Sequence, residues 1–325
     1  MYKLDNDLKF TWKNRSHPRQ THLLDRECVI PKRSLTIDYN GRCFHCICDG
    51  WMPWPVGNLM DFSSIEEIFN SSLSKKLQAS TDLNGSFKFC NTFHCGIRKN
   101  SKKKAQHYQI NIGIDESCNL QCPSCREFLV FHKKNKEYFS RKQLMDHFLN
   151  LIENFHEPVE ITIGSNGDAF ASLIYRDFFY KIKNNKNTKF VLKSNGLLLE
   201  KKIKIYPIID MIKRIEISVD AACEETYKKV RSPIGWDKLM SNLSFINKTL
   251  NIELILNFVI QKNNFHDIYP FFNFCKQFNA TPNFSLLENW GTWPTFYEHS
   301  VEDSRNNFYN EWLIVKSDLM DKKLL

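Results

Sequence analysis

The stretch "QINIGIDESCNLQCPSC", residues 109–125, joins a run of apolar residues to a loop that contains three cysteines. The run at 109–114 is typical of a β-strand. Cys118, Cys122 and Cys125 follow it at the spacing C-x-x-x-C-x-x-C, and no fourth cysteine lies close behind. Thiolates are soft ligands that select zinc, copper(I) or iron–sulfur clusters. The stretch therefore predicts a strand that ends in a metal-binding loop.

The chain from Tyr108 onward alternates short apolar runs with amphipathic patterns at helical spacing. We expect strands at 109–114, 159–163, 189–193, 214–219, 253–260 and 283–287, with helical patterns that include 141–155, 175–185 and 236–250. Repeated strand–helix units imply parallel strands joined by right-handed crossovers. The predicted fold class is α/β, as a partial (β/α)6 TIM-like barrel with a small cysteine-rich N-terminal domain. A doubly wound sheet would satisfy the same pattern.

A polar stretch follows each of the six predicted strands. These stretches are the cysteine loop, "GSNGD" (164–168), "SNG" (194–196), "DAACEE" (220–225), "QKNN" (261–264) and "ENWGTW" (288–293). In parallel α/β folds, ligands bind at the carboxyl ends of the strands. We therefore expect all six loops to face one mouth.

The first hundred residues lack this rhythm. Residues 28–59 predict a β-hairpin region with turns at "DYNG" (38–41) and "PVGN" (55–58), and residues 63–78 predict one helix capped by Ser63 or Ser64. A small region this irregular is commonly held together by metal. The predicted domains are a cysteine-rich domain at 1–105, a core at 106–290 and an aromatic-rich tail at 291–325.

Length, charge and cysteine usage narrow the class of protein. The 325 residues can form one large core, or one core with a small satellite domain. The N-terminus has no apolar signal region and no apolar run is long enough to span a bilayer, so we expect a cytoplasmic protein. In that compartment, eleven cysteines, nine of them before residue 126, indicate metal binding or catalysis rather than disulfides. With a net charge of +9, the basic run at 98–106 is interpreted as a solvated linker, with phosphate binding as the lesser alternative.

The three-cysteine loop lacks an obvious fourth ligand. His132 is the nearest candidate for zinc, but structural zinc ligands usually come as two pairs. An electron-transfer ferredoxin gives each iron of a cubane its own thiolate. A cluster with only three protein thiolates leaves one iron open to a substrate or cofactor, just as catalytic zinc keeps an open position. The incomplete set therefore favours catalysis.

The motif Cys118-x-x-x-Cys122-x-x-Cys125, on the loop after the first of six strands, resembles that of the radical S-adenosylmethionine (radical SAM) enzymes. The resemblance implies that these cysteines bind a [4Fe-4S] cluster whose fourth iron is chelated by the amino and carboxylate groups of S-adenosylmethionine. Reduction of the cluster would cleave the sulfonium and release a 5′-deoxyadenosyl radical, which abstracts a hydrogen atom from the substrate. A flavodoxin- or ferredoxin-type reductant is the implied electron donor.

The resemblance also implies cofactor contacts in the loops after the second to fifth strands. The positions that match are Gly164, Asn166, Gly167, Asp168, Ser194, Asn195, Ser218, Asp220, Arg231, Val259 and Gln261. The first four would accept the cofactor amine, although the family's usual glutamate is absent. Arg231 would pair with the cofactor carboxylate, a bidentate role suited to guanidinium. Ser124 stands where the family often has an aromatic residue, which implies weaker packing beside adenine; Ser194 and Asn195 taken singly could be turn residues.

The upstream cysteines resemble the auxiliary-cluster motif of the SPASM/Twitch group of radical SAM enzymes. Cys28 is followed by twelve residues, then Gly41, four residues and Cys46. The resemblance implies a second, fully thiolate-ligated [4Fe-4S] cluster in the domain at 1–105, held by Cys28, Cys46, Cys90 and Cys95. In the relatives this module follows the barrel, whereas here it precedes it. Alternatives are ligation by Cys43, Cys48, His45 or His94, and a single zinc knuckle.

The sequence indicates the reaction and the substrate less closely than it indicates the cluster and the cofactor. A fully ligated auxiliary cluster would carry an electron or order its domain, which permits dehydrogenation, epimerisation or bond formation on a sugar, nucleotide or peptide. Cys223, just past the fourth strand, is the candidate catalytic hydrogen donor; the alternative is an ordinary buried residue. The aromatic tail would either pack the open edge of the barrel or close its mouth. Two other hypotheses are an iron–sulfur electron-transfer protein and a zinc-stabilised nucleic-acid-binding protein.

Overall fold

A computed structural model describes residues 27–46, 52–90 and 107–322 of the chain. Cys48, His94, Cys95 and the basic run at 98–106 therefore lie outside the described residues. The chain divides into two compact units. The first comprises the described residues up to Glu116 together with His132–Asn166 and Leu173–Phe190, and the second comprises Ser117–Phe131, Gly167–Ser172 and the residues from Val191.

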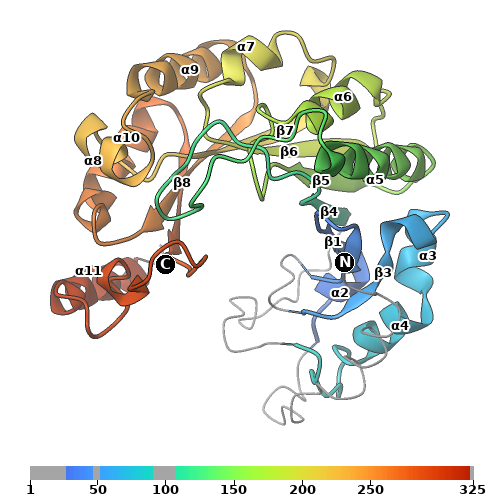
Figure 1. The fold of residues 1–325 in the computed structure, drawn as a ribbon. Helices are drawn as coiled ribbons and strands as arrows, with labels where there is room; N and C mark the ends of the chain where they lie inside the picture. Colours follow the sequence, from blue (N-terminus) through green and yellow to red (C-terminus); the bar gives the residue numbers. More distant parts are fainter. Residues whose placement is uncertain (1–26, 47–51, 91–106, 323–325) are drawn as a thin grey trace. The chain divides into compact units, whose positions relative to one another are not determined.

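The first unit contains a mixed sheet in the strand order β3-β2-β1-β4-β5 (Figure 1). The strands are β1 (Ser34–Ile37), β2 (Arg42–Phe44), β3 (Pro55–Asn58), β4 (Tyr108–Ile112) and β5 (Val159–Ile163). The N-terminal hairpin strands pair antiparallel, whereas β1 pairs parallel with β4, placing Leu35 opposite Ile110. The helices are α2 (Ile30–Arg33), η2 (Leu59–Asp61), α3 (Ile65–Asn70), α4 (Ser72–Ala79), α5 (Lys136–Glu153) and α6 (Leu173–Lys181). The N-terminal segment thus continues the sheet that carries the cysteine loop.

Two local predictions for this segment are wrong. The stretch 55–58 is not a turn but strand β3, which pairs antiparallel with β2 and buries Val56. The register of this pair shifts between Cys43 and Phe44. The single helix expected at 63–78 is two helices, α3 and α4. Ser71 has extended backbone and its hydroxyl accepts a hydrogen bond from the Ser74 N–H (3.2 Å), so it starts a new helix.

The second unit contains the parallel strands β7 (Ile212–Ser218), β8 (Glu253–Ile260) and β9 (Thr281–Leu286), and β6 (Thr188–Ser194) ends in it. Its helices are α7 (Leu199–Ile203), η5 (Ile209–Met211), α8 (Glu224–Val230), α9 (Trp236–Thr249), η6 (Phe265–Asp267), α10 (Ile268–Gln277), η7 (Phe296–Glu298) and α11 (Tyr309–Asp321). All six predicted strands are present, so the α/β class is confirmed. The partial barrel and the separate N-terminal domain stay predictions.

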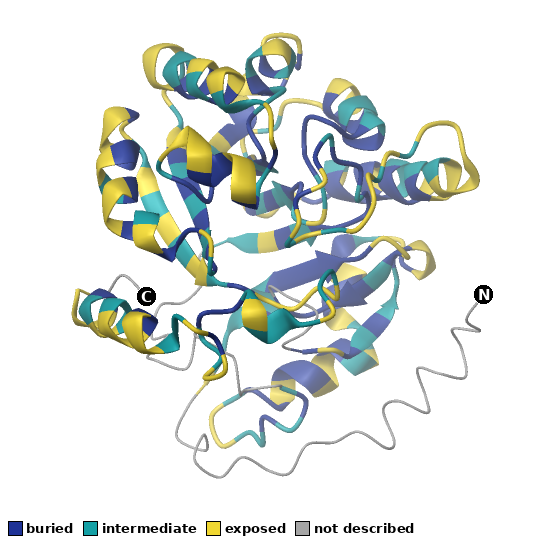
Figure 2. Cartoon of the chain, turned by 60° about the vertical axis from the view of Figure 1, so that its left-hand side comes forward, coloured by how far each residue is buried: buried dark blue, intermediate teal, exposed yellow. Residues whose placement is uncertain are grey.

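The core lies between the strands and the inner faces of the helices (Figure 2). Phe258 of β8 packs against Phe271 of α10 and Phe284 of β9, with ring centroids 4.8 and 5.5 Å apart. In the tail, Trp312 of α11 is fully buried, which favours packing over a lid for this helix. Within the described ranges, no helix has both the length and the apolar character needed to cross a membrane.

Candidate metal centre and cofactor site

The three cysteines lie on a loop that closes on itself within the second unit. The Cys118 N–H donates to the Val130 carbonyl (2.9 Å), which joins the two ends of the loop. The Cys122 carbonyl accepts hydrogen bonds from the backbone N–H groups of Cys125 (3.0 Å) and Arg126 (3.3 Å), so a tight turn presents Cys125. Cys118 and Cys122 are buried, whereas Cys125 is exposed. The loop thus offers three thiols from one short segment, two of them shielded from solvent.

Hydrogen-bond donors surround the Cys118 sulfur. It accepts from the Leu120 N–H (3.4 Å) and from the Asn195 side-chain amide (3.7 Å), the kind of bonds that stabilise a cluster-bound thiolate. Burial raises the pKa of Cys118 and Cys122, and the charge of Arg231 counteracts this at both sulfurs. A bound metal would displace these protons, since the ligand is the thiolate.

The described residues include no group of three or more His, Cys, Asp or Glu side chains gathered as the ligands of a single ion would be. In a cubane, each thiolate binds a different iron atom, so the sulfurs need not converge on one point. His132, the candidate zinc ligand, belongs to the other unit, where its Nδ1 lies 3.5 Å from the Asn135 side chain. The three-cysteine set is therefore suited to a cluster.

Asp168 joins the loops that follow β5 and β6 to the cysteine loop. One carboxylate oxygen accepts from the N–H groups of Phe170 (2.9 Å) and Ala171 (3.0 Å). The other accepts from the Ser194 hydroxyl (2.8 Å) and the Asn195 N–H (2.7 Å). Its own N–H donates to the Ser117 carbonyl, 2.9 Å away. All four acceptor sites of the carboxylate are thus occupied, so Asp168 holds loops in place; a contact with the cofactor amine stays a prediction.

The rest of the "GSNGD" stretch is divided between the units. Gly164 and Asn166 belong to the first unit, and Gly167 belongs to the second with Asp168. Gly164 has φ +96°, a left-handed conformation that favours glycine. The Asn166 amide donates to the Gly113 carbonyl (3.3 Å), just before the cysteine loop. Cofactor contacts at these positions remain predictions.

Asp220 is the centre of a second network, at the carboxyl ends of β7 and β8. Its carboxylate accepts from the Arg231 guanidinium (3.0 Å) and from the Val259 N–H (2.7 Å). The Asn264 side chain donates to the carbonyls of Asp220 and Val259 (2.9 Å each) and accepts from the Gln261 N–H (2.8 Å). Asp220 has φ +58°, a strained conformation that the surrounding bonds maintain. The predicted residues Asp220, Arg231, Val259 and Gln261 are therefore brought together.

Three buried donors beside this network have no hydrogen-bond partner among the described residues. They are the Arg231 Nε, the Gln261 side-chain nitrogen and the hydroxyl of Tyr227. Tyr227 lies on α8, one helical turn before its C-cap Arg231, is fully buried, and has its pKa raised by burial to about 12. Burial would lower the pKa of Arg231, but Cys122 and Asp220 raise it overall. Buried polar groups are normally paired, so these unpaired donors, two of them close to Cys122, fit a ligand that carries acceptor atoms.

Tyr227 is a residue that sequence reasoning missed. The apolar pattern of α8 marks it as an ordinary core residue, and only its spacing of four from Arg231 places both on one helical face. Ser218, at the end of β7, is half-buried and paired in register with Asn257.

Cys223 is exposed, so the alternative of an ordinary buried residue is wrong. It is the N-cap residue of α8, and its sulfur lies 3.5 Å from the Thr226 hydroxyl and 3.9 Å from a carboxylate oxygen of Asp267. These contacts direct the thiol toward η6. A role as hydrogen donor stays a prediction.

The upstream cysteines differ in their surroundings. The N–H of Cys28 donates to the Thr81 carbonyl (2.9 Å), and the Cys46 carbonyl accepts from the Thr36 hydroxyl (2.6 Å), so the backbones of both are fixed. Cys90 is half-buried after a turn from Phe87. Ligation of a cluster by these three cysteines and by Cys95 stays a prediction.

Two of the competing ligands, Cys43 and His45, are buried. Cys43 is fully buried on β2, and burial raises the pKa of its thiol strongly. Both ring nitrogens of His45 are engaged, with the Ser34 carbonyl (3.2 Å) and the Ser74 hydroxyl (2.6 Å). Burial lowers the pKa of His45 to about 4. A ring with both nitrogens occupied has no free lone pair for a metal.

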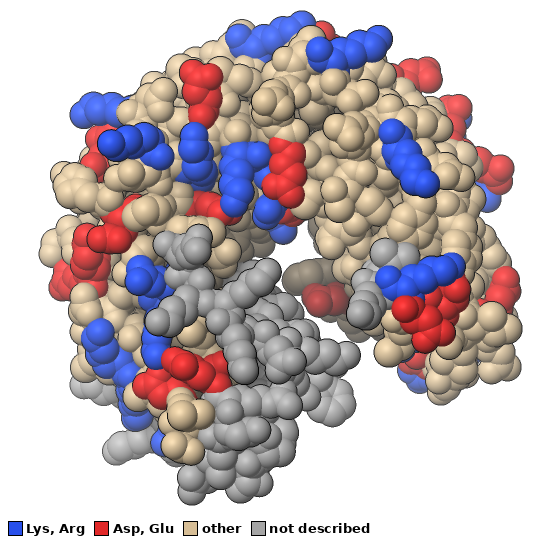
Figure 3. Space-filling view, turned by 180° about the vertical axis from the view of Figure 1, so that it is seen from behind, with Lys and Arg blue, Asp and Glu red and all other residues tan. Residues whose placement is uncertain are grey.

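Charged side chains of both signs are interspersed on the face shown in Figure 3. On the strands of the second unit, Glu216 pairs with Arg214 (2.9 Å) and Lys193 (3.4 Å), and Arg214 also pairs with Glu253 (3.7 Å). These pairs reduce the positive charge available to phosphate groups. The basic run on which the nucleic-acid hypothesis depended lies outside the described residues.

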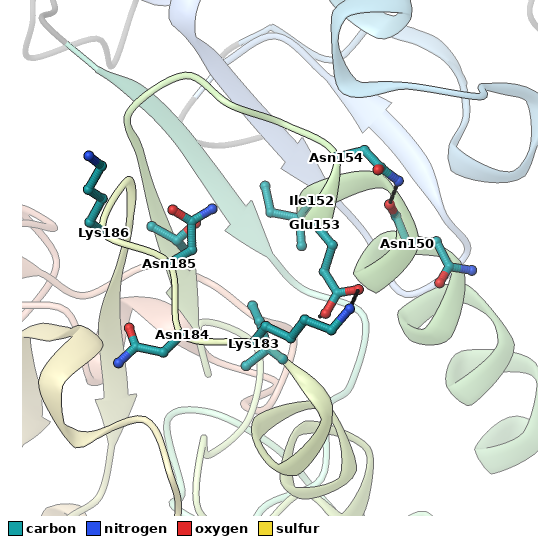
Figure 4. Close-up of a pocket in the computed structure, with 10 residues that line it drawn as sticks. Asn150, Ile152, Glu153, Asn154, Lys183, Asn184, Asn185 and Lys186 are labelled. Atoms are coloured by element: carbon teal, nitrogen blue, oxygen red, sulfur yellow. Dashed lines mark hydrogen bonds and ion pairs between the residues drawn. The ribbon is translucent and has the colours of Figure 1, made fainter.

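A polar cavity of about 420 Å³ in the first unit is lined by none of the predicted site residues (Figure 4). Its lining includes Glu153 and Lys183, an ion pair at 3.7 Å, and Asn154, whose amide donates to the Asn150 carbonyl at 2.8 Å. The cavity is at the carboxyl ends of α5 and α6, hence at the amino ends of the strands that follow. Ligands of parallel α/β folds bind at the opposite ends.

Residues 28–96 match the family model SPASM, described as an iron-sulfur cluster-binding domain. The predicted SPASM character of this segment is thereby confirmed, whereas the Twitch detail stays a prediction. No curated protein matches the chain.

Three solved structures show partial likeness. They are TYW1 with a lysine-pyruvate adduct bound (TM-score 0.39, 15% identity, 54% of this chain and 62% of that chain) and two structures of Streptococcus suis SuiB. SuiB bound to its precursor peptide SuiA gives TM-score 0.39 and 13% identity over 55% of this chain and 39% of that chain. SuiB bound to S-adenosylmethionine gives 0.39 and 14% over 56% and 41%. The matches span less than two thirds of each of these proteins.

Proposed function

We propose that the chain is a radical SAM enzyme with an auxiliary iron–sulfur segment. Cys118, Cys122 and Cys125 would hold a [4Fe-4S] cluster with one iron open to S-adenosylmethionine. When bound, that pair supplies a one-electron reductive cleavage that yields methionine and a 5′-deoxyadenosyl radical, which abstracts a hydrogen atom from the substrate. The observation that carries the proposal is the set of unpaired buried donors of Tyr227 and Arg231 near Cys122.

The chain's own residues account for cofactor retention. S-adenosylmethionine carries a carboxylate and an adenine ring, both with hydrogen-bond acceptors. The Arg231 Nε and the Tyr227 hydroxyl could donate to the carboxylate, and the Gln261 amide, just beyond β8, could donate to the adenine. Asp220 would hold the Arg231 guanidinium in position through its 3.0 Å bond. Because each donor has lost its contacts with water, a bound acceptor removes an energetic cost.

The auxiliary segment at 28–96 would carry a second [4Fe-4S] cluster and pass electrons between the first cluster and the substrate. A flavodoxin- or ferredoxin-type protein is the proposed reductant. Dehydrogenation, epimerisation or bond formation on a sugar, nucleotide or peptide are the reaction classes that this arrangement allows.

The test is reductive cleavage of S-adenosylmethionine by oxygen-free, iron-reconstituted protein with dithionite. We expect 5′-deoxyadenosine, about eight irons per chain and a change in the reduced-cluster EPR spectrum on adding S-adenosylmethionine. Replacing Cys118, Cys122 and Cys125 together with alanine should abolish cleavage and remove about half of the iron. Cys275, buried in α10, supplies the matched control, since Cys275→Ala should change neither. Full iron loading without any 5′-deoxyadenosine would contradict the proposal and favour electron transfer alone.

A further inference from the structure

A buried arginine on helix α5 contacts both the SPASM segment and the two acidic residues that precede the cysteine loop. The Arg141 side chain is only 8% exposed, although it is charged and occupies the middle of a helix. Its Nη2 donates to the Glu116 carboxylate (2.8 Å), and its Nη1 lies 3.6 Å from the fully buried carboxylate of Asp115. These two acids precede Cys118 by two and three residues. Burying a charged side chain costs free energy unless its partners are held in place, so a buried arginine at this point suggests a specific role.

The backbone at this point is also held from a second helix. The hydroxyl of Tyr175, a fully buried residue of α6, accepts from the Asp115 N–H (2.9 Å) and lies 3.2 Å from the carbonyls of Ile112 and Asp115. The end of β4 and the first residues after it are therefore held in place by the side chains of Arg141 and Tyr175. The far end of the loop is followed directly by His132, whose pKa is lowered by burial and by the charge of Arg141. Arg141 thus acts on the residues that immediately precede the cysteine loop and on the residue that immediately follows it.

The opposite face of the guanidinium contacts the SPASM segment. The Arg141 Cζ lies 5.3 Å from the ring centroid of Tyr39, in the turn between β1 and β2, a cation–π geometry. Two further observations place the SPASM segment against α5, one at Gly41 in this turn and one at Phe62 after η2. Any Cβ at Gly41 would lie 2.6 Å from Leu144, and the His147 ring donates to the Phe62 carbonyl at 3.0 Å. Arg141 therefore contacts the SPASM segment and also the residues that lead into the cysteine loop. Under the proposed function, each of these two segments holds one cluster.

We infer that Arg141 is a positioning residue that couples the SPASM segment to the S-adenosylmethionine-binding loop. Tyr39 fixes the guanidinium, and the guanidinium fixes Asp115 and Glu116, which set where Cys118 begins its turn. The inference rests on the proposed function for what the loop binds, but the coupling itself is a property of the metal-free fold. Lysine cannot replace the arginine, because one ammonium cannot lie over the Tyr39 ring, donate to Glu116 and place a second charged nitrogen 3.6 Å from Asp115.

The coupling is tested first by hydrogen exchange of the full-length metal-free protein, read in peptides that cover 113–118. We expect Arg141→Lys and Tyr39→Leu each to increase exchange there, whereas Tyr39→Phe, which keeps the ring, should leave it unchanged. Tyr39 is 40% exposed, so its replacement should not prevent folding. Faster exchange in Arg141→Lys alone would overturn the coupling to the SPASM segment, and unchanged exchange in both would overturn the inference altogether.

The second readout is the reconstituted enzyme. Both disruptive variants should raise the KM for S-adenosylmethionine about 10-fold or more, with a smaller change in kcat, as loss of an outer-shell partner does. The EPR spectrum of the reduced first cluster should shift in the same variants and not in Tyr39→Phe. A fall in kcat of about 10-fold, with no change in KM or in the EPR spectrum, would contradict a role of Arg141 in positioning the loop. If wild-type protein cleaves no S-adenosylmethionine, the proposed function fails while the exchange result still decides the coupling.

Discussion

Replacing Asp168 with asparagine should destabilise the folded chain by about 2 kcal/mol at neutral pH. The substitution keeps the shape but leaves one acceptor oxygen where the carboxylate has two. If that oxygen keeps the N–H groups of Phe170 and Ala171, the new amide nitrogen faces the Ser194 hydroxyl and the Asn195 N–H. Ser194 can turn to accept, whereas the Asn195 N–H loses its acceptor. One unpaired buried N–H costs about 1–3 kcal/mol, and removing a buried charge offsets part of the total.

The cost should depend on pH in a defined direction. Burial raises the pKa of Asp168, and the bonds from Asn195 and Ser194 lower it without cancelling that effect. The folded chain therefore holds a proton at this site more tightly than the unfolded chain does. The stability that the folded chain gains from this tighter proton binding is fully present below the ordinary carboxyl pKa of 3.8. It declines as the pH rises through the raised pKa, and above that pH the stability at this site no longer changes. The difference between wild type and Asp168→Asn should accordingly be larger in acid than at pH 7.

Urea unfolding of oxygen-free, reconstituted protein, followed by tryptophan fluorescence, measures both quantities. The variant should show a lower midpoint with an unchanged m-value. Glu157→Gln is the matched control, because it makes the same chemical change at an exposed position. A free energy of unfolding for Asp168→Asn within about 0.5 kcal/mol of the wild-type value, as for a surface substitution, would refute the assignment of four essential hydrogen bonds.

Other variants address the site. Arg231→Lys should raise the KM for S-adenosylmethionine about tenfold, because an ammonium lacks the second donor; an unchanged KM would remove Arg231 from cofactor binding. Cys46→Ala should lose about four irons, whereas Cys43→Ala should lose none, because Cys46 is the residue that matches the ligand position of the motif; the reverse iron contents would exchange their roles. Cys223 should react readily with a thiol reagent at pH 8, and Cys275 only after unfolding, because burial raises the pKa of Cys275 to about 12. Unchanged turnover and product in Cys223→Ala would exclude that thiol as hydrogen donor.

The elements that sequence patterns predicted well are those whose signal is local. Strand β8 is present at the predicted bounds, because its alternating apolar side chains are buried on one face. The prediction of a single helix at 63–78 was wrong for a reason that is also local. The apolar spacing continues through both α3 and α4, and the cap at Ser71 has no effect on that spacing. Serine in a helical pattern is thus a weak signal until its hydroxyl is seen to accept a backbone bond.

By itself, the sequence determined the α/β class, the cysteine loop after β4 and the residues that end the later strands, because periodicity and ligand spacing are written in neighbouring residues. Only the tertiary structure decided that β1 pairs with β4, that Arg141 joins Tyr39 to Asp115, and that the Tyr227 hydroxyl lies buried without a partner. These facts depend on contacts between residues far apart in the chain. No local pattern distinguishes a tyrosine that only fills the core from one whose hydroxyl is available to a ligand, since both are buried on the same face of a helix.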